Sequence, residues 1–300
     1  MHIQATMPLP AGFRPQDFLL FHGRDKQEVS ERITPDALQK AIVLKGYPAL
    51  LGLKFSQDKV HYTLDVDNAQ VNVTLDEVHA LIRHILGFNQ AIEIFEQAYA
   101  GHPFIGRMVT TQSGLRVPVS VSPYEAVTWA ILAQQISLSA ATALRRKFIQ
   151  LVDLRHSSGL YCYPSAELVS GLLPERLREA GISHTKATAL IQVSQQVVSG
   201  DLPLNAWLQT ETPSQEIAHA LSGIKGIGPW TINYTLLRGY GWLDGSLHGD
   251  AAVRRAIRGL MVLDELSEKE AARWLQTYQP WRALLAAHLW AWQHALAQQL

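Results

Sequence analysis

Cysteine is almost absent from this 300-residue chain, and neither sign of charge is in excess. The single cysteine, Cys162, excludes an internal disulfide, a cysteine-based zinc site and a four-cysteine iron–sulfur cluster. With 26 basic and 26 acidic residues the net charge is zero, which argues against a protein that coats DNA with bulk positive charge. One unpaired cysteine fits a reducing compartment.

Long apolar runs and a secretory leader are missing as well. No apolar stretch reaches the roughly 18 residues that a membrane span requires. The start of the chain lacks the basic residues and the apolar core of a signal peptide. We therefore expect a cytoplasmic protein without a membrane partner. At roughly 150 residues per domain, its length predicts about two domains.

The charges are unevenly distributed along the chain. Residues 1–100 carry 9 basic and 12 acidic residues, a net charge of −3, which leaves +3 for residues 101–300. Within residues 223–258 five basic residues face two acidic ones. The five are Lys225, Arg238, Arg254, Arg255 and Arg258. This surplus indicates either a solvated helix face or a local patch that can meet DNA.

Strand and helix signals mix in the first hundred residues. Residues 60–66 alternate apolar and polar side chains, and residues 69–73 are expected to return as the second strand of a hairpin. Residues 49–55 are a further strand candidate. Thr34 and Pro35 predict the start of one helix. A capping box that begins at Thr74 predicts another, so an α+β domain is expected.

Beyond about residue 120 the signals are helical. Capping-box patterns predict three helix starts, at Ser122, Thr212 and Ser267. Glycines fall where the helical periodicity lapses and predict caps or turns; they are Gly159, Gly171, Gly181, Gly200 and Gly223. This part is predicted to be one all-α domain or a pair of all-α lobes.

The most informative stretch is the glycine-rich segment 221–231. A helix that starts near Thr212 is predicted to end near Gly223, and a tight loop follows. Pro229 then starts a second helix at a position where its missing N–H leaves no bond unmade. The pattern predicts a helix–hairpin–helix.

This loop has the composition of a phosphate-binding site. Gly226 and Gly228 let the backbone approach a ligand closely, and the free amides at the helix start suit a phosphate oxygen. Lys225 adds a positive charge beside them. The alternative is a tight corner between two helices that binds nothing.

Two further features follow the hairpin. Trp230, Tyr234 and Arg238 recur at a spacing that places them on one helix face, either in the core or in a stacking pocket. Asp250 precedes an apolar-periodic helix, so it is a candidate N-cap with Arg254 as its partner four residues on. The same geometry also suits an ionised carboxylate that stabilises a developing cation.

Together these residues resemble a known family. The run Gly-Ile-Gly-Pro-Trp-Thr-Ile-Asn-Tyr, an arginine eight residues after its Trp and an Asp twenty after it are similar to the helix–hairpin–helix DNA glycosylase superfamily. The similarity is closest to the bacterial DNA-3-methyladenine glycosylase II family. Residues 124–137 resemble its first helix and wedge turn, 280–290 its C-terminal helix, and 103–118 its interdomain passage. Residues 1–100 share only the α+β pattern.

The resemblance implies a mainly α fold with an α+β N-terminal domain over residues 1–100 and a helical glycosylase domain over 101–300. Two helical lobes would flank a cleft. The central lobe would span 124–242, with the helix–hairpin–helix at 213–238. The second lobe would combine 101–123 with 243–300.

The resemblance also assigns roles around the base. Asp250 matches the catalytic aspartate, which stabilises the oxocarbenium-like sugar or helps to activate water. Trp230, Tyr234 and Trp290 match aromatic positions of the pocket for the flipped base, and Phe21 is a further candidate from the N-terminal domain. Such an electron-rich pocket suits a cationic, alkylated base.

The DNA contacts implied by the resemblance centre on the hairpin. The DNA-binding candidates are Gly226, Gly228, Lys225, Thr231, Gln135 and His248. A monovalent cation, Na⁺ or K⁺, is expected on the hairpin carbonyls of Ser222, Ile224 and Ile227, with no side-chain metal site and no other cofactor. The partner would be double-stranded DNA with damaged bases, bound by a monomer in the bacterial cytosol or nucleoid.

The sequence departs from related patterns at three places. Bifunctional branches of the superfamily carry a Lys where this chain has Trp230, so no lyase activity is expected. Gln135 stands at the wedge position, where a close family member has Leu, which leaves the preference for the opposite base open. His248 and Gly249 replace a Pro-Asp pair, and His248 is either a phosphate contact or a plain loop residue.

The main hypothesis is a monofunctional DNA glycosylase that removes alkylated purines, similar to 3-methyladenine, from duplex DNA by base flipping in base excision repair. A second is a non-catalytic DNA-binding or damage-recognition protein of the same fold. A third is a helical protein unrelated to DNA, which predicts no salt-dependent binding of a duplex.

Overall fold

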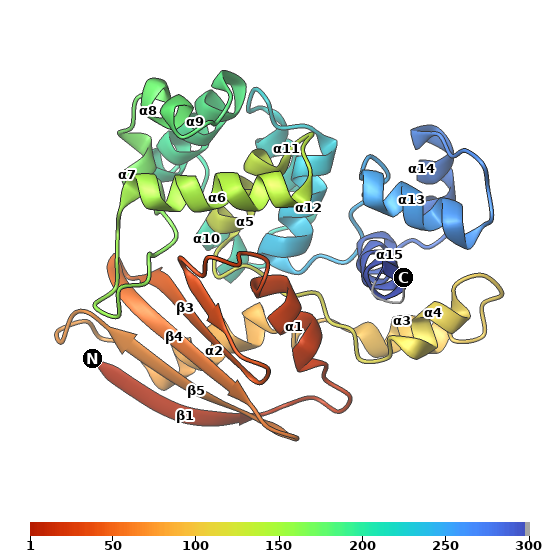
Figure 1. The fold of residues 1–300 in the computed structure, drawn as a ribbon, viewed down its shortest axis with the longest axis horizontal. Helices are drawn as coiled ribbons and strands as arrows, with labels where there is room; N and C mark the ends of the chain where they lie inside the picture. Colours follow the sequence, from red (N-terminus) through yellow and green to blue (C-terminus); the bar gives the residue numbers. More distant parts are fainter. Residues whose placement is uncertain (298–300) are drawn as a thin grey trace.

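The computed structural model of the chain describes residues 1–297 and consists of an N-terminal sheet followed by helices (Figure 1). The strands are β1 (His2–Pro8), β2 (Glu31–Ile33), β3 (Ala37–Leu44), β4 (Tyr47–Phe55) and β5 (Lys59–Val66). The first helices are α1 (Pro15–His22), α2 (Leu75–Ile85), α3 (Ile92–Tyr99), α4 (Gly106–Thr111), α5 (Pro123–Ala133) and α6 (Leu138–Val152). The next are α7 (Ala166–Ser170), α8 (Pro174–Glu179), α9 (His184–Ser199), α10 (Leu204–Gln209) and α11 (Ser214–Ser222). The last are α12 (Pro229–Tyr240), α13 (Ala251–Leu260), α14 (Glu268–Gln276) and α15 (Arg282–Ala297).

The sheet is antiparallel, in the order β1-β5-β4-β3-β2. In β5 every second side chain is buried, as the alternation predicted, and β4 confirms the strand expected over 49–55. The buried face packs on α1 and α2 through residues such as Phe18 and Ile82. Within residues 1–297, no helix combines the length and apolar character needed to cross a membrane.

Two predictions in this domain are wrong. Thr34 and Pro35 form the turn between β2 and β3, where the Thr34 N–H donates to the Ala37 carbonyl (2.9 Å), because sheet pairing of the following residues outweighs the local cap signal. Residues 69–73 form no strand. Both edges of β5 are already paired, by β1 and β4, and the Asn68 side chain accepts the Gln70 N–H (2.8 Å) in a turn.

The helix starts are mostly those predicted. Thr74 and Ser267 each close a complete capping box, and the Ser122 hydroxyl accepts the N–H of Glu125. The capping box predicted at Thr212 is wrong. Helix α11 begins after Pro213, and the Thr212 hydroxyl instead lies within hydrogen-bond distance (2.9 Å) of the Thr210 hydroxyl.

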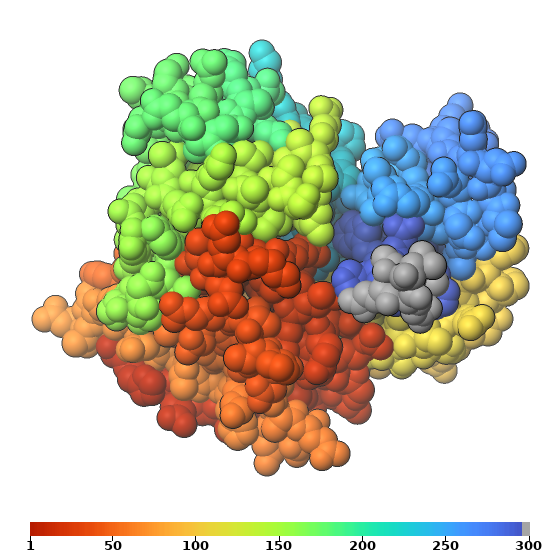
Figure 2. Space-filling model, viewed as in Figure 1, coloured from red at the N-terminus to blue at the C-terminus, as the bar shows by residue number. Residues whose placement is uncertain are grey.

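Three large apolar cores divide residues 1–297, besides a small cluster around Cys162. One lies under the sheet, one within the central helical lobe from α5 to α12, and one within a second lobe built from α3, α4 and α13 to α15. Ile92 and Phe95 belong to the second lobe, so the sheet domain ends between Phe88 and Ile92 and not at residue 100. Figure 2 shows a hollow on the surface between the two helical lobes.

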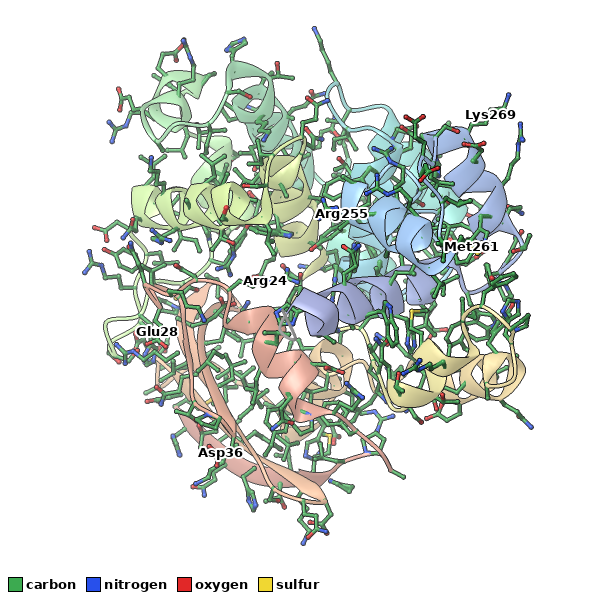
Figure 3. The ribbon with its side chains drawn as sticks, turned by 45° about the vertical axis from the view of Figure 1, so that its right-hand side comes forward. Arg24, Glu28, Asp36, Arg255, Met261 and Lys269 are labelled. Carbon is green, nitrogen blue, oxygen red and sulfur yellow. The ribbon has the colours of Figure 1, made fainter. Side chains whose placement is uncertain are left out.

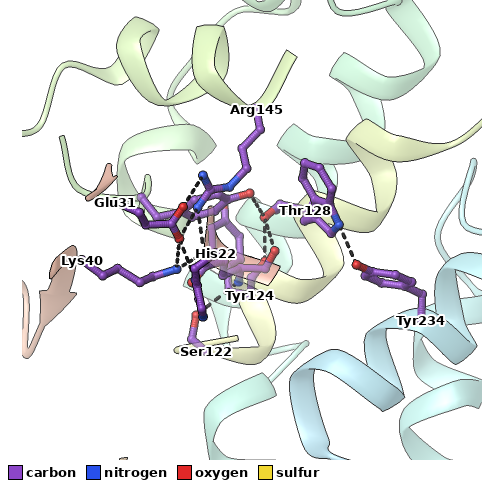
Figure 4. A network of polar contacts seen from close by, with 11 residues as sticks. His22, Glu31, Lys40, Ser122, Tyr124, Thr128, Arg145 and Tyr234 are labelled. Atoms are coloured by element: carbon purple, nitrogen blue, oxygen red, sulfur yellow. Dashed lines mark hydrogen bonds and ion pairs between the residues drawn. The ribbon is translucent and has the colours of Figure 1, made fainter. Parts of the chain in front are cut away.

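A buried ionic network joins the sheet domain to the central lobe (Figure 4). The Lys40 ammonium, on β3, donates to Glu31 (2.8 Å) and to Glu125 on α5 (2.7 Å), and Arg145 on α6 contacts both carboxylates at 3.2 Å. Burial alone would raise the pKa of Glu31, but Arg145 and Lys40 hold that pKa well below its usual range. Burial acts against ionisation of Glu125 as well, but Lys40 and Arg145 lower its pKa, so both carboxylates should stay ionised inside the protein.

Two histidines, the half-buried His84 and the buried His288, should make the stability of the fold depend on pH. Burial lowers the pKa of His84 to about 4 and that of His288 to about 3. Since the folded pKa lies below the unfolded value near 6.5, the unfolded chain binds more protons, and the free energy of unfolding falls as the pH drops below 6.5. Each histidine should contribute a slope of about 1.4 kcal/mol per pH unit until its folded pKa is reached.

Urea unfolding at pH 7, 6 and 5 measures this slope. The matched variant is His84→Gln, whose free energy of unfolding should depend less on pH than that of the parent. Equal slopes in the two proteins would show that His84 does not contribute to the pH dependence of stability.

Candidate active site

Asp250 is the N-cap of α13, as its position before an apolar-periodic helix predicted. One carboxylate oxygen, Oδ1, accepts the N–H groups of Ala252 (2.9 Å) and Val253 (3.0 Å). Two indole N–H groups also donate to the carboxylate, Trp230 to Oδ2 (3.0 Å) and Trp290 to Oδ1 (3.2 Å). All four donors are uncharged. Among residues 1–297, no cation forms an ion pair with this carboxylate, which is held in place by neutral donors alone.

The expected partner of this carboxylate lies elsewhere. Arg254 was predicted to pair with Asp250, but it pairs with Glu268 on α14 (3.3 Å). Glu268 accepts Arg254 because α14 packs beside α13 and brings the carboxylate within reach. His248 also turns toward this side: its Nδ1 is 2.8 Å from the Ser246 hydroxyl, and its Nε2 is 3.7 Å from Glu268.

Aromatic rings flank the carboxylate. Trp230 and Tyr234 stack with ring centres 5.1 Å apart, and Trp290 lies 6.3 Å from Tyr234. The Tyr234 hydroxyl accepts the indole N–H of Trp129 on α5 (2.8 Å), and this bond fixes the orientation of the Tyr234 ring. Trp230 and Trp290 are only partly buried, whereas Tyr234 is buried. The structure thus brings the three predicted pocket aromatics together with Asp250.

The loop between α12 and α13 sets the position of α15 and of Trp290 on it. The Arg282 guanidinium binds both oxygens of Asp244 (2.8 and 3.0 Å). The N–H groups of Ala283 and Leu284 donate to the Leu243 carbonyl. These bonds tie the start of α15 to the loop that leads to Asp250.

Phe21 reaches this region from the N-terminal domain, as expected. Its ring centre lies 4.4 Å from the guanidinium carbon of Arg238 and 4.4 Å from that of Arg24. Arg238 also lies over Trp290 (5.6 Å) and donates to the Pro118 carbonyl (2.8 Å). Burial lowers the pKa of Arg238 to about 10, so the side chain remains charged at neutral pH.

The hairpin has the predicted conformation. Gly226 adopts a φ of +92°, which favours glycine, and Gly228 is the N-cap of α12 with Pro229 in the first turn. Within residues 1–297, the N–H groups of Gly226 and Gly228 donate to no backbone carbonyl, and Lys225 is exposed. These groups remain available to an anion.

Thr231 differs from the other hairpin candidates. Its side chain is buried, and its hydroxyl accepts from the Gln134 amide (2.7 Å), which also donates to the Gly226 carbonyl (2.8 Å). Thr231 therefore lies inside the hairpin and offers no hydroxyl to the surface. Gln134 ties the hairpin to the turn after α5.

The turn after α5 projects Gln135 outward. Gln135 is exposed and has a φ of +55°, uncommon for a residue with a side chain. The Lys186 ammonium, on α9, donates to the carbonyls of Leu132 (2.8 Å) and Gln134 (2.9 Å) and so holds the end of α5. The predicted wedge residue thus lies on a turn that is held by Lys186 and, through Gln134, by the hairpin.

Several residues that support the site carry no local sequence signal. Trp129, Gln134 and Lys186 act through partners 105, 97 and 54 residues away. Local patterns carry no signal for such pairs. Phe21 lies on α1, and Arg24 follows two residues after the end of that helix. The sequence patterns did not predict α1.

Residues 128–280 match the family described as HhH-GPD superfamily base excision DNA repair protein. The chain belongs to the HhH-GPD superfamily. The match spans the hairpin, Asp250 and their surroundings, and it confirms the resemblance recognised from residues 226–250.

Curated relatives of this HhH-GPD protein include DNA-3-methyladenine glycosylase 2 of Escherichia coli, 28% identical over 194 residues, which are 63% of this chain and 65% of that protein. The chain therefore spans just under two thirds of the length of that relative. A DNA-3-methyladenine glycosylase of Bacillus subtilis is 22% identical over 95% of both chains.

The solved structure of a 3-methyladenine DNA glycosylase from Archaeoglobus fulgidus superposes with a TM-score of 0.82 at 21% identity. The superposition covers 97% of this chain and 98% of the other. It confirms the predicted fold class, an α+β N-terminal domain followed by helical lobes, because it extends over the sheet domain as well as the helices.

Proposed function

We propose that this HhH-GPD protein is a monofunctional DNA glycosylase that releases alkylated purines from duplex DNA after flipping them out of the helix. The observation that supports it most is the Asp250 carboxylate, held by four uncharged N–H groups between Trp230 and Trp290. A fixed negative charge beside stacking rings suits a reaction in which positive charge develops on the sugar. The names of the curated relatives point to the same reaction.

The bond changes follow from this geometry. The C1′–N glycosidic bond breaks, and its electron pair leaves with the base. Asp250 stabilises the cationic sugar or takes a proton from the attacking water, whose oxygen then bonds to C1′. Trp230, Tyr234 and Trp290 would stack on the extruded base, which is most favourable when alkylation has made it cationic.

The absence of lyase activity is part of the proposal. Cleavage of the DNA strand through a Schiff base requires an amine that attacks C1′. The pocket side chains beside Asp250 are Trp230, Tyr234 and Trp290, none of which is an amine. The product should therefore be an intact strand with an abasic site.

The hairpin is proposed to hold a DNA phosphate and a monovalent cation. Within residues 1–297, no backbone N–H donates to the carbonyls of Ser222 or Ile227, although the Ile224 carbonyl accepts from Ile227 (3.1 Å). Two free carbonyls fit such an ion. When bound, Na⁺ or K⁺ would add positive charge beside the phosphate. The described residues contain no cluster of His, Cys, Asp or Glu that could bind a metal.

The decisive experiment measures base release from duplexes that each carry one lesion. 3-Methyladenine, 7-methylguanine, hypoxanthine and an oxidised base are compared by chromatography of the free base. The proposal expects alkylated purines to be released fastest, with strand cleavage only after alkali. Binding of these duplexes without any base release would instead favour a damage-recognition protein.

Gln135 provides a test of base flipping. We expect Gln135→Ala to lower base release from a duplex about tenfold, because nothing fills the gap left by the extruded base. Release from a single strand carrying the same lesion should be unchanged. Comparing the four opposite bases in the parent protein shows whether the Gln135 amide pairs with the orphaned base. Equal loss on single and double strands would contradict a wedge role.

A further inference from the structure

The five basic residues of segment 223–258 have different surroundings in the structure. Arg238 is buried beside Phe21 and Trp290, and Arg254 is paired with Glu268. Lys225 lies exposed on the hairpin, in the central lobe. Arg255 and Arg258 lie exposed on α13, in the second lobe. The basic surplus therefore resolves into two separate exposed sites.

Helix α13 is divided into two faces. Val253, Ala256 and Ile257 are buried in the core of the second lobe. The other face, at positions 251, 254, 255 and 258, lines an open hollow of about 170 Å³ together with Leu266. Three of its five lining residues are arginines, and none is an acid. Within residues 1–297, Arg255 and Arg258 have no carboxylate at ion-pair distance, whereas Arg254 does.

This hollow lies next to the candidate active site. Ala251, one of its lining residues, directly follows Asp250 and is the first residue of α13. Figure 3 shows Arg255 on the part of α13 nearer the central lobe, away from Met261 and Lys269. An anion in the hollow would therefore lie beside Ala251, the residue that follows the catalytic candidate Asp250.

We propose that this arginine face of α13 binds backbone phosphates of the DNA strand on the second-lobe side of the extruded nucleotide. The inference rests on the proposed function. Guanidinium groups offer planar, paired donors that match phosphate oxygens, and residues three apart on a helix are neighbours, so Arg255 and Arg258 reach a common stretch of backbone. The hairpin and α13 then contact the phosphate backbone on opposite sides of the Asp250 pocket.

The test is the salt dependence of binding for the double variant Arg255→Gln/Arg258→Gln. A duplex with an uncleavable abasic analogue is titrated by fluorescence anisotropy at several salt concentrations. Loss of two phosphate contacts should reduce the slope of log K against log salt by about 1.8, at about 0.9 per contact. Affinity near 100 mM salt should fall at least tenfold. Arg176→Gln/Arg178→Gln changes two exposed arginines on α8, of which Arg176 contacts Glu179 (2.7 Å); it is the control and should leave the slope unchanged.

Two outcomes overturn the proposal. The first is a salt slope and a duplex affinity of the variant that equal those of the parent protein. If inorganic phosphate then raises the melting temperature of the parent but not of the variant, the arginines form an anion site unrelated to DNA. The second is an equal loss in the α8 control. Because the analogue cannot be cleaved, the result does not depend on base release, so failure of the proposed reaction is seen separately.

Discussion

Asp250→Asn is expected to lower single-turnover base release from a methylated duplex by about 10²–10³-fold. The change removes the negative charge that would face the cationic sugar. It also places an amide opposite the indole N–H groups of Trp230 and Trp290, which now donate to the carboxylate. Base release is measured by chromatography with enzyme in excess, so that binding does not limit the rate.

The same variant carries its own control for folding. Asn is about as good an N-cap as Asp, so the bonds from Ala252 and Val253 can be kept and the stability of α13 should change little. A melting temperature and a duplex affinity close to those of the parent would show that only the chemistry is affected. A release rate within a few fold of the parent would exclude Asp250 from the catalytic role.

Lys40→Met is expected to reduce the free energy of unfolding by about 3–5 kcal/mol. Lys40 is 2% exposed and lies between Glu31 and Glu125, so its removal leaves two buried carboxylates with Arg145 as their main cation. Breaking a buried pair is far more destabilising than replacing the whole pair, because the remaining charge stays desolvated.

A matched lysine lies five residues further along the chain. Lys45 pairs with Glu77 at 2.7 Å, but both side chains are more than 40% exposed. Lys45→Met should therefore change stability by less than about 1 kcal/mol. Urea unfolding of the two variants gives the comparison. Similar losses in both would mean that burial of the network does not set its strength.

The network also links stability to the candidate site. His22 on α1, whose Nδ1 lies 3.1 Å from Glu31, is the neighbour of Phe21, and Glu125 lies on the same helix as Trp129. The sheet domain, which carries Phe21 beside Arg238, is thus joined to α5 by a buried ionic core.

Local signals in the sequence were sufficient for the helical part of the site. The Asp250 N-cap, the Gly226 turn and the first-turn Pro229 depend on bonds between residues a few positions apart, so their side-chain types predict them directly. The same holds for the caps at Thr74, Ser122 and Ser267. The family resemblance then related these local features to one another.

Residues with competing long-range partners were not predictable in this way. Glu125 stands at the capping-box position after Ser122, yet its carboxylate is taken by Lys40, 85 residues away. Arg254 is taken by Glu268, and residues 37–44 become β3 because neighbouring strands pair with them. For Glu125 burial in a low-dielectric core, and for residues 37–44 a complete set of sheet hydrogen bonds, outweighs a local preference of less than about 2 kcal/mol. Arg254 and Glu268 remain largely solvent-accessible, and the packing of α14 beside α13 alone brings them together.

The sequence by itself determined the hairpin, the cap at Asp250 and the membership in a DNA repair superfamily, since these depend on short-range geometry and on a recognisable motif. Only the tertiary structure decided which side chains meet at Asp250 and that the Gln134 amide donates to the Thr231 hydroxyl. It also decided which arginines have no carboxylate partner within the described part of the chain. The physical reason is that a side chain has several potential partners along the chain, and packing selects the one that is brought within hydrogen-bond distance and shielded from water.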